Sequence, residues 1–155
     1  MQMLFQWDIT KDSPEQVQEL FWGNWRRAGR SPWHLKKEPE EPRPAGVDES
    51  LRTSANELFT GTVAAKDEID SILRRNAEHW RLERMAAVDR NILRLGIFEL
   101  IHRRETPPVV VINEALEIAR KFSEEDSVGF INGLLDQIRK EVEAAQSEPR
   151  PSSMS

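Results

Sequence analysis

The stretch KFSEEDSVGFINGLLDQI, residues 121–138, contains the residues of this chain whose types and spacing most suggest chemistry. An acidic loop, two glycines and Phe130 lie there between two helix-like segments. On a helix that turns about 100° per residue, Phe130 falls about 100° from the centre of the apolar face. A ring at that edge can pack in the core or stack against a flat ligand, and the geometry leaves both alternatives open. Gly129 suits the start of a helix, and Gly133 suits close approach of a neighbouring helix.

Patterns typical of catalysis or metal binding are missing from the sequence. His34, His79 and His102 are isolated, so no HExxH pair can share a zinc ion. The run SEEDS, residues 123–127, lacks the alternating ligands and central glycine of a calcium loop, and it suits a solvated connection between helices. Residues 61–68 lack the GK[ST] ending of a phosphate-binding loop, and no serine has a GxSxG setting. We therefore expect no enzyme, no cofactor and no metal.

Composition limits the class of protein. A chain of 155 residues with 38% hydrophobic and 32% charged residues suits one helical globular domain. The absence of cysteine excludes disulfide and thiolate chemistry. The net charge of −5 argues against indiscriminate nucleic-acid binding, but it permits a local RNA patch or a basic partner. The N-terminus does not resemble a signal peptide, and no apolar run approaches the ~18 residues of a membrane span. We expect a soluble cytoplasmic protein without membrane contact.

Apolar residues recur at spacings of three and four along most of the chain, which predicts an all-α fold. A short helix is expected over residues 3–9, and residues 14–22 are expected to start another. Longer helices are expected over residues 51 to about 76 and 82 to about 102, followed by two with apolar faces from Ile112 to Phe122 and from Val128 to Val142. Ser13 and Pro14 are N-cap and first-turn signals. Apolar stripes on two sides of the helix over 82–102 predict that it is packed between neighbours.

The predicted domain covers residues 1–145 and is interrupted by a proline-rich segment at 31–50, which we expect to be a flexible linker. Residues 146–155 are expected to form a disordered tail. The segment from residue 22 to 37 contains three tryptophans, no acidic residue and a group of basic residues that includes Arg26, Arg27 and Arg30. Arginines between aromatic residues suit single-stranded RNA. Alternatively, Trp22 and Trp25 pack on the core and the basic side chains are merely solvated.

Three motifs resemble the NusB transcription antitermination family in order and spacing: VDRNILRLGIFEL (88–100), VINEALEIARKF (111–122) and EDSVGFINGLLDQI (125–138). LFQW, residues 4–7, resembles the end of the first helix of that family. The resemblance implies two small three-helix bundles packed as one globular domain, without enzymatic activity. It also implies binding of boxA RNA in nascent transcripts, notably of ribosomal RNA operons, together with the small-subunit ribosomal protein NusE. The pair joins the elongating RNA polymerase complex with other Nus factors.

The resemblance assigns roles to individual residues. Phe5 matches an aromatic residue on the RNA side, and Asp126 and Phe130 match positions beside the same RNA path. Phe130 would then be a ring on which an unpaired base stacks. Glu83 and Asp89 match acidic positions that face the ribosomal partner, which suits recruitment of a basic protein by an acidic one.

The chain departs from the family at its start, because the arginine-rich segment that normally precedes the aromatic pair is absent before Met1. Either the true start lies upstream, or the protein binds RNA more weakly alone. The second explanation motivates an alternative function, an adaptor that binds NusE with little RNA affinity of its own. A third interpretation is the RNA-targeting domain of a ribosomal RNA methyltransferase, which shares this helical fold. An exposed apolar partner face could also be covered in a homodimer.

Overall fold

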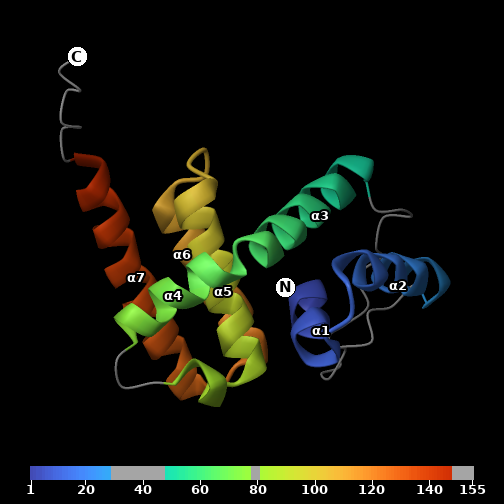
Figure 1. Ribbon diagram of the computed structural model, residues 1–155, viewed down its shortest axis with the longest axis horizontal. Helices are drawn as coiled ribbons and strands as arrows, with labels where there is room; N and C mark the ends of the chain where they lie inside the picture. Colours follow the sequence, from blue (N-terminus) through green and yellow to red (C-terminus); the bar gives the residue numbers. More distant parts are fainter. Residues whose placement is uncertain (29–47, 78–80, 148–155) are drawn as a thin grey trace. The chain divides into compact units, whose positions relative to one another are not determined.

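The computed structural model describes residues 1–28, 48–77 and 81–147, and every regular element within these ranges is helical (Figure 1). The prediction of an all-α fold is confirmed. In chain order the elements are α1 (Gln2–Thr10), α2 (Pro14–Ala28), α3 (Glu49–Ala64), α4 (Lys66–Asn76), the short 3₁₀-helix η1 (Leu82–Arg84), α5 (Ala87–His102), α6 (Pro108–Phe122) and α7 (Glu125–Ser147).

The chain separates into two compact units, Met1–Val63 and Ala64–Ser155. The first contains α1, α2 and nearly all of α3, and the second contains α4 to α7. The sequence predicted continuous helix from residue 51 to about 76, and this is wrong because a turn at Ala65 separates α3 from α4. Most of the predicted linker at 31–50 and residues 148–155 of the predicted tail lie outside the described residues.

Local hydrogen bonds define the turn between α1 and α2. Lys11 ends α1 in a left-handed conformation with φ of 61°, and its backbone N–H donates to the carbonyl of Trp7. The backbone N–H of Gln16 donates to Oγ of Ser13, and the backbone N–H of Ser13 donates to Oε1 of Gln16, at 3.3 and 3.1 Å. This reciprocal pair is a capping box, and it confirms the predicted N-cap at Ser13. From Pro14, α2 continues through Ala28, so residues 14–22 form the start of a longer helix, as predicted.

Two helix ends extend into segments expected to be irregular. The side chain of Asp48 accepts hydrogen bonds from the backbone N–H and the hydroxyl of Ser50, at 3.3 and 2.6 Å. An aspartate at this position caps a helix N-terminus, so α3 begins at Glu49. At the other end of the chain, α7 runs through Ser147, two residues into the predicted tail.

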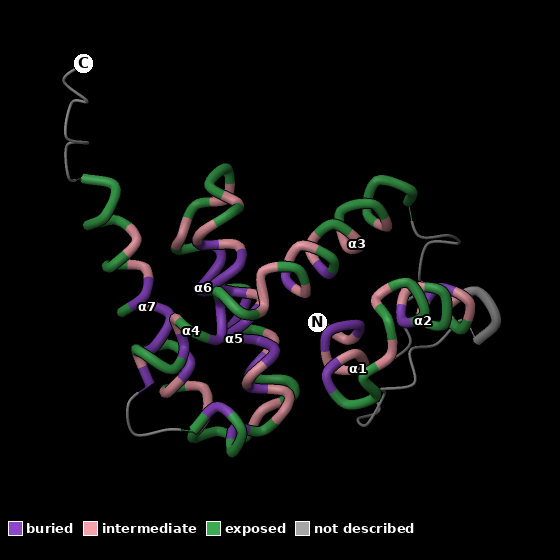
Figure 2. Tube along the Cα trace, viewed as in Figure 1, coloured by how far each residue is buried: buried purple, intermediate pink, exposed green. Residues whose placement is uncertain are grey.

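The core of the second unit is centred on α5. Helices α5, α6 and α7 contact one another pairwise, and α4 packs on α5 and α7. Buried positions recur along all three long helices (Figure 2). Leu93 and Ile97 of α5 are completely buried, and Leu100 is nearly so, which confirms that this helix packs between neighbours.

Two details of the second unit differ from the expected helices. The helix predicted to start at Leu82 begins at Ala87, after η1 and a short extended connection. Phe122 was expected on the apolar face of α6 but is 46% exposed, because it is the last residue of that helix. In the first unit, Leu51 of the predicted apolar pattern is likewise exposed, in the first turn of α3.

Three glycines differ in the space around them: Gly96 lies where α5 and α7 pack closely, whereas Gly129 and Gly133 lie on an open surface of α7. At Gly96 of α5, an added Cβ atom would lie 3.1 Å from Cδ2 of Leu135 on α7, so the small residue permits the helices to approach. At Gly129 and Gly133 of α7 an added Cβ atom would meet nothing within 4 Å. The prediction that Gly133 serves close helix approach is therefore wrong.

A buried ion pair links α4 to α5. Nε and Nη2 of Arg94 donate to the two carboxylate oxygens of Asp70 at 2.8 and 3.0 Å, and both side chains are almost inaccessible to solvent. Nζ of Lys66 lies 3.1 Å from Oδ2 of the same carboxylate. Burial by itself favours the neutral acid, but the hydrogen bonds and charges of Arg94 and Lys66 outweigh it and hold the pKa of Asp70 below its ordinary value.

Replacing Asp70 with alanine leaves the guanidinium of Arg94 buried without its carboxylate. We expect the free energy of unfolding, measured by urea denaturation at pH 7, to fall by about 3–5 kcal/mol. Because the folded pKa of Asp70 is lowered, the stabilisation is complete above the unfolded aspartate pKa of about 3.9. It is lost as the pH falls through the folded pKa. Replacing the fully exposed Asp67 with alanine is the control, and equal effects at the two positions would contradict a special role for the buried pair.

Replacing Gly133 with alanine should raise the free energy of unfolding by about 0.5–1 kcal/mol, because the methyl group meets no neighbour and alanine restricts the unfolded chain. The matched variant Gly96→Ala forces Leu135 to move, so we expect no gain there. Urea denaturation of both variants checks this difference. A loss of stability at position 133 would show that the surface around it is not open.

Candidate nucleic-acid interface

The junction between α6 and α7 presents acidic side chains in a short connection. The N–H of Ser123 donates to the carbonyl of Ala119 at 2.8 Å and ends α6, and α7 starts two residues later at Glu125. Glu125 and Asp126 are therefore in the first turn of α7, where negative charge is favoured by the helix dipole. Both side chains are exposed.

Phe130 lies in the second turn of α7 and is half-buried. Ile131, the next residue, is completely buried. Gly129, which precedes Phe130, and Gly133, about one helical turn after it, are both exposed. The ring therefore lies at the edge of the buried face, as the helical geometry predicts. Gly129 and Gly133 themselves add no side chain to the surface next to Phe130, and an added Cβ atom at either would meet nothing within 4 Å.

The remaining residue expected on the RNA side belongs to the other unit. Phe5 is half-buried on α1, next to the buried Leu4. Phe5 lies in the first unit, whereas Asp126 and Phe130 lie together on α7 in the second.

The two acidic residues expected to face a partner differ in exposure. Glu83 lies exposed on η1, where its Oε1 accepts a hydrogen bond from Nη2 of Arg74 at 3.3 Å. A backbone hydrogen bond, and then the side chain of Arg74, hold the pKa of Glu83 below its ordinary value. Asp89 is only 9% exposed, and its Oδ2 accepts a hydrogen bond from Oγ of Ser127 at 2.8 Å. Of the pair, only Glu83 presents an open carboxylate.

Sequence reasoning missed the contribution of Ser127 and of Arg90. Nη1 of Arg90 donates to the carbonyls of Leu82 and Met85 at 3.2 and 3.3 Å, and so ties η1 to α5. Arg90 lies in the motif VDRNILRLGIFEL and Ser127 in the motif EDSVGFINGLLDQI, and each follows an acidic residue, Asp89 or Asp126. These signals mark the residues, but they do not show which hydrogen bonds their side chains make.

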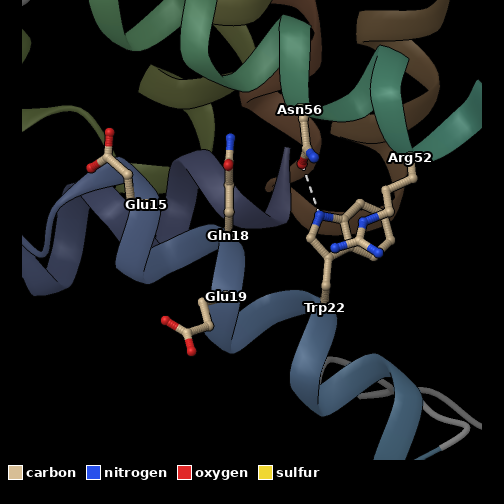
Figure 3. Close-up of a pocket in the computed structure, with 6 residues that line it drawn as sticks. All are labelled: Glu15, Gln18, Glu19, Trp22, Arg52 and Asn56. Atoms are coloured by element: carbon tan, nitrogen blue, oxygen red, sulfur yellow. Dashed lines mark hydrogen bonds between the residues drawn. The ribbon is translucent and has the colours of Figure 1, made fainter. Parts of the chain in front are cut away.

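Within the first unit, residues of α2 and α3 line an open depression of about 270 Å³ (Figure 3). Nε1 of Trp22 donates to Oδ1 of Asn56 at 2.8 Å, and the guanidinium carbon of Arg52 lies 5.4 Å from the centroid of a Trp22 ring. Glu15 and Glu19 add two exposed carboxylates from α2. These contacts hold α2 against α3, and the burial of Trp22 agrees with its interpretation as a packing residue.

The basic residues that follow Trp22 are described only in part. Arg26 and Arg27 belong to α2, but their side chains are outside the described set. Arg30 lies outside the described residues altogether. The RNA-binding role assigned to the three arginines stays a prediction.

A search of the described residues finds no group of three histidine, cysteine, aspartate or glutamate side chains that could hold a metal ion. Among the helices described, none is long and apolar enough to cross a membrane.

Comparison with known proteins identifies relatives along almost the whole chain. The model of the NusB family matches residues 1–140. The chain is 42% identical over 148 residues to transcription antitermination protein NusB of Koribacter versatilis, a match covering 96% of this chain and 88% of that protein. It is 41% identical to the protein of the same name from Solibacter usitatus, covering 96% and 89%.

Solved structures agree with the sequence comparison. NusB of T. maritima superposes with a TM-score of 0.70 at 30% identity, covering 90% of this chain and 84% of that one. A complex of the antitermination factors NusB and NusE with double-stranded RNA superposes with a TM-score of 0.66 at 26% identity, covering 90% and 89%. The three motifs, the helical architecture and these matches together show that the chain belongs to the NusB family.

Proposed function

We propose that this protein is a transcription antitermination factor that binds boxA-type RNA together with the ribosomal protein NusE. The RNA is part of nascent transcripts, notably those of ribosomal RNA operons, and the pair joins the elongating RNA polymerase with other Nus factors. The observation that carries the proposal is the half-buried ring of Phe130 beside two exposed glycines, in a chain of the NusB family. A relative solved with NusE and RNA supports the choice of ligands.

The surface around Phe130 suits an unpaired base. Single-stranded RNA exposes the faces and edges of its bases, and proteins bind the faces by stacking on aromatic rings. Asp126 lies in the first turn of α7, four residues before Phe130, and its carboxylate can only accept hydrogen bonds. It therefore suits amino groups on base edges and not phosphates. Phe5 on α1 is proposed to contribute a second aromatic contact, with Arg26, Arg27 and Arg30 at the phosphates.

The surface around η1 suits a basic protein. Glu83 presents an ionised carboxylate on an exposed turn, and the net charge of the chain is −5. Electrostatic complementarity of this kind speeds association and selects the partner. The alternative function, an adaptor for NusE without useful RNA affinity, is not favoured, because the relatives are antitermination proteins along nearly their full length.

The proposal is tested by fluorescence anisotropy of labelled boxA RNA titrated with the full chain, with and without purified NusE, at two salt concentrations. A scrambled RNA of equal length is the control. We expect binding that is selective for boxA, tighter with NusE and weaker at the higher salt concentration, because phosphate contacts release counterions. Equal binding of the scrambled RNA would contradict the proposal. Binding of NusE without any selective RNA binding would support the adaptor.

Replacing Phe130 with alanine removes the stacking surface. We expect the boxA affinity of the complex with NusE to fall by about 1–3 kcal/mol for each base that stacks there. Phe130→Tyr keeps an aromatic face and should retain most of the affinity. Val109→Ala removes an exposed apolar side chain at the other end of α6 and should leave the affinity unchanged. Unchanged RNA binding by a folded Phe130→Ala protein would remove Phe130 from the RNA site.

A further inference from the structure

One hydrogen bond joins the N-terminal ends of α5 and α7. Oγ of Ser127 donates to Oδ2 of Asp89 at 2.8 Å, across 38 residues of sequence. Ser127 is the third residue of α7 and Asp89 the third residue of α5, so both lie in the first turn of their helices. Hydrogen bonds to a charged acceptor such as a carboxylate are stronger than those between neutral groups.

The carboxylate of Asp89 is buried with only part of its hydrogen-bonding capacity used. The residue is 9% exposed, and Oδ1 is inaccessible to solvent without a hydrogen-bond partner among the described residues. A buried carboxylate of this kind opposes stability, so an arrangement that retains one calls for a functional explanation. Since its other oxygen accepts from Ser127, the position of the carboxylate and that of the first turn of α7 depend on each other.

A second set of bonds connects Asp89 to the exposed η1 turn. Arg90, the neighbour of Asp89, donates to the carbonyls of Leu82 and Met85, which lie on either side of Glu83. The backbone N–H of Met85 also donates to the carbonyl of Leu82, at 3.3 Å. A displacement of the turn that carries Glu83 is therefore passed to the first turn of α5.

The opposite end of this chain of contacts is the candidate RNA surface. Ser127 directly follows Asp126 and precedes Phe130 by three residues, which is close to one helical turn. A helix turn moves as a unit, because its backbone bonds fix the relative positions of its residues. The orientation of Asp126 and Phe130 therefore follows the position of Ser127.

We infer that the Asp89–Ser127 hydrogen bond couples the partner-binding turn at Glu83 to the RNA-binding turn at Asp126 and Phe130. Asp89 is then a positioning residue inside the protein and not itself a partner contact. Binding of a basic protein on η1 fixes the turn held by Arg90, fixes Asp89, and orders the start of α7 for RNA. By reciprocity, RNA on α7 tightens binding of the partner by the same factor. This inference rests on the proposed function.

The test measures coupling and not affinity alone. The dissociation constant of labelled boxA RNA is determined for the full chain with and without saturating NusE, and the ratio of the two values is the coupling factor. In Ser127→Ala we expect this factor to fall by about fivefold or more, whereas the affinity for NusE without RNA stays close to that of the wild type. Ser127→Thr keeps the hydroxyl and should restore the factor. Ser71→Ala, at an exposed position of α4, is the matched control.

A double-mutant cycle excludes a general loss of structure. If one hydrogen bond carries the coupling, Asp89→Ala and Ser127→Ala together lower the factor no more than either does alone. A wild-type coupling factor in a folded Ser127→Ala protein would overturn the inference and leave the proposed function standing. Absence of selective RNA binding, or of tightening by NusE, in the wild type itself would overturn the proposed function and the inference with it.

Discussion

The guanidinium of Arg94 is the constraint on which the second unit depends, because a permanent positive charge lies buried in its core. Such a charge is tolerated only beside a carboxylate in good geometry. Asp70 provides it and thereby fixes α4 against α5. Arg74, one turn further along α4, is consequently held where its guanidinium reaches Glu83 on η1. The exposed acidic turn proposed to meet a partner is thus positioned by an ion pair that no partner touches.

Much of the fold is predictable from local patterns. Helical periodicity and the Ser13 cap predicted most helix positions within a few residues. The break at Ala65 was not predictable, because alanine has the highest helix propensity and gives no sign of a turn. The separate start of α5 at Ala87 was missed for the same reason, since Met85 and Ala86 continue a helical pattern.

The candidate site, too, has features that the sequence predicts and features that it does not. The edge position of Phe130 follows from helical geometry, whereas its proposed ligand came from the resemblance to a family. Burial of Asp89 was not predictable, because an aspartate in the first turn of a helix is usually exposed and favoured there by the helix dipole. The role of a glycine likewise depends on tertiary contacts. The sequence does not distinguish Gly96 from Gly133, but in the structure Leu135 packs close to Gly96, whereas the surface at Gly133 is open.

The turn between α1 and α2 has a consequence for the order of folding. Its bonds, from Lys11 to Trp7 and between Ser13 and Gln16, join residues no more than four apart. Closing such short loops costs little chain entropy, and contacts of this kind form on the timescale of helix formation. The first two helices can therefore take their shape as soon as about thirty residues have left the ribosome, before any of α5 to α7 exists. The turn between α1 and α2 then precedes the helices carrying the proposed RNA surface, and its formation does not wait for the long-range pairing of Asp70 with Arg94.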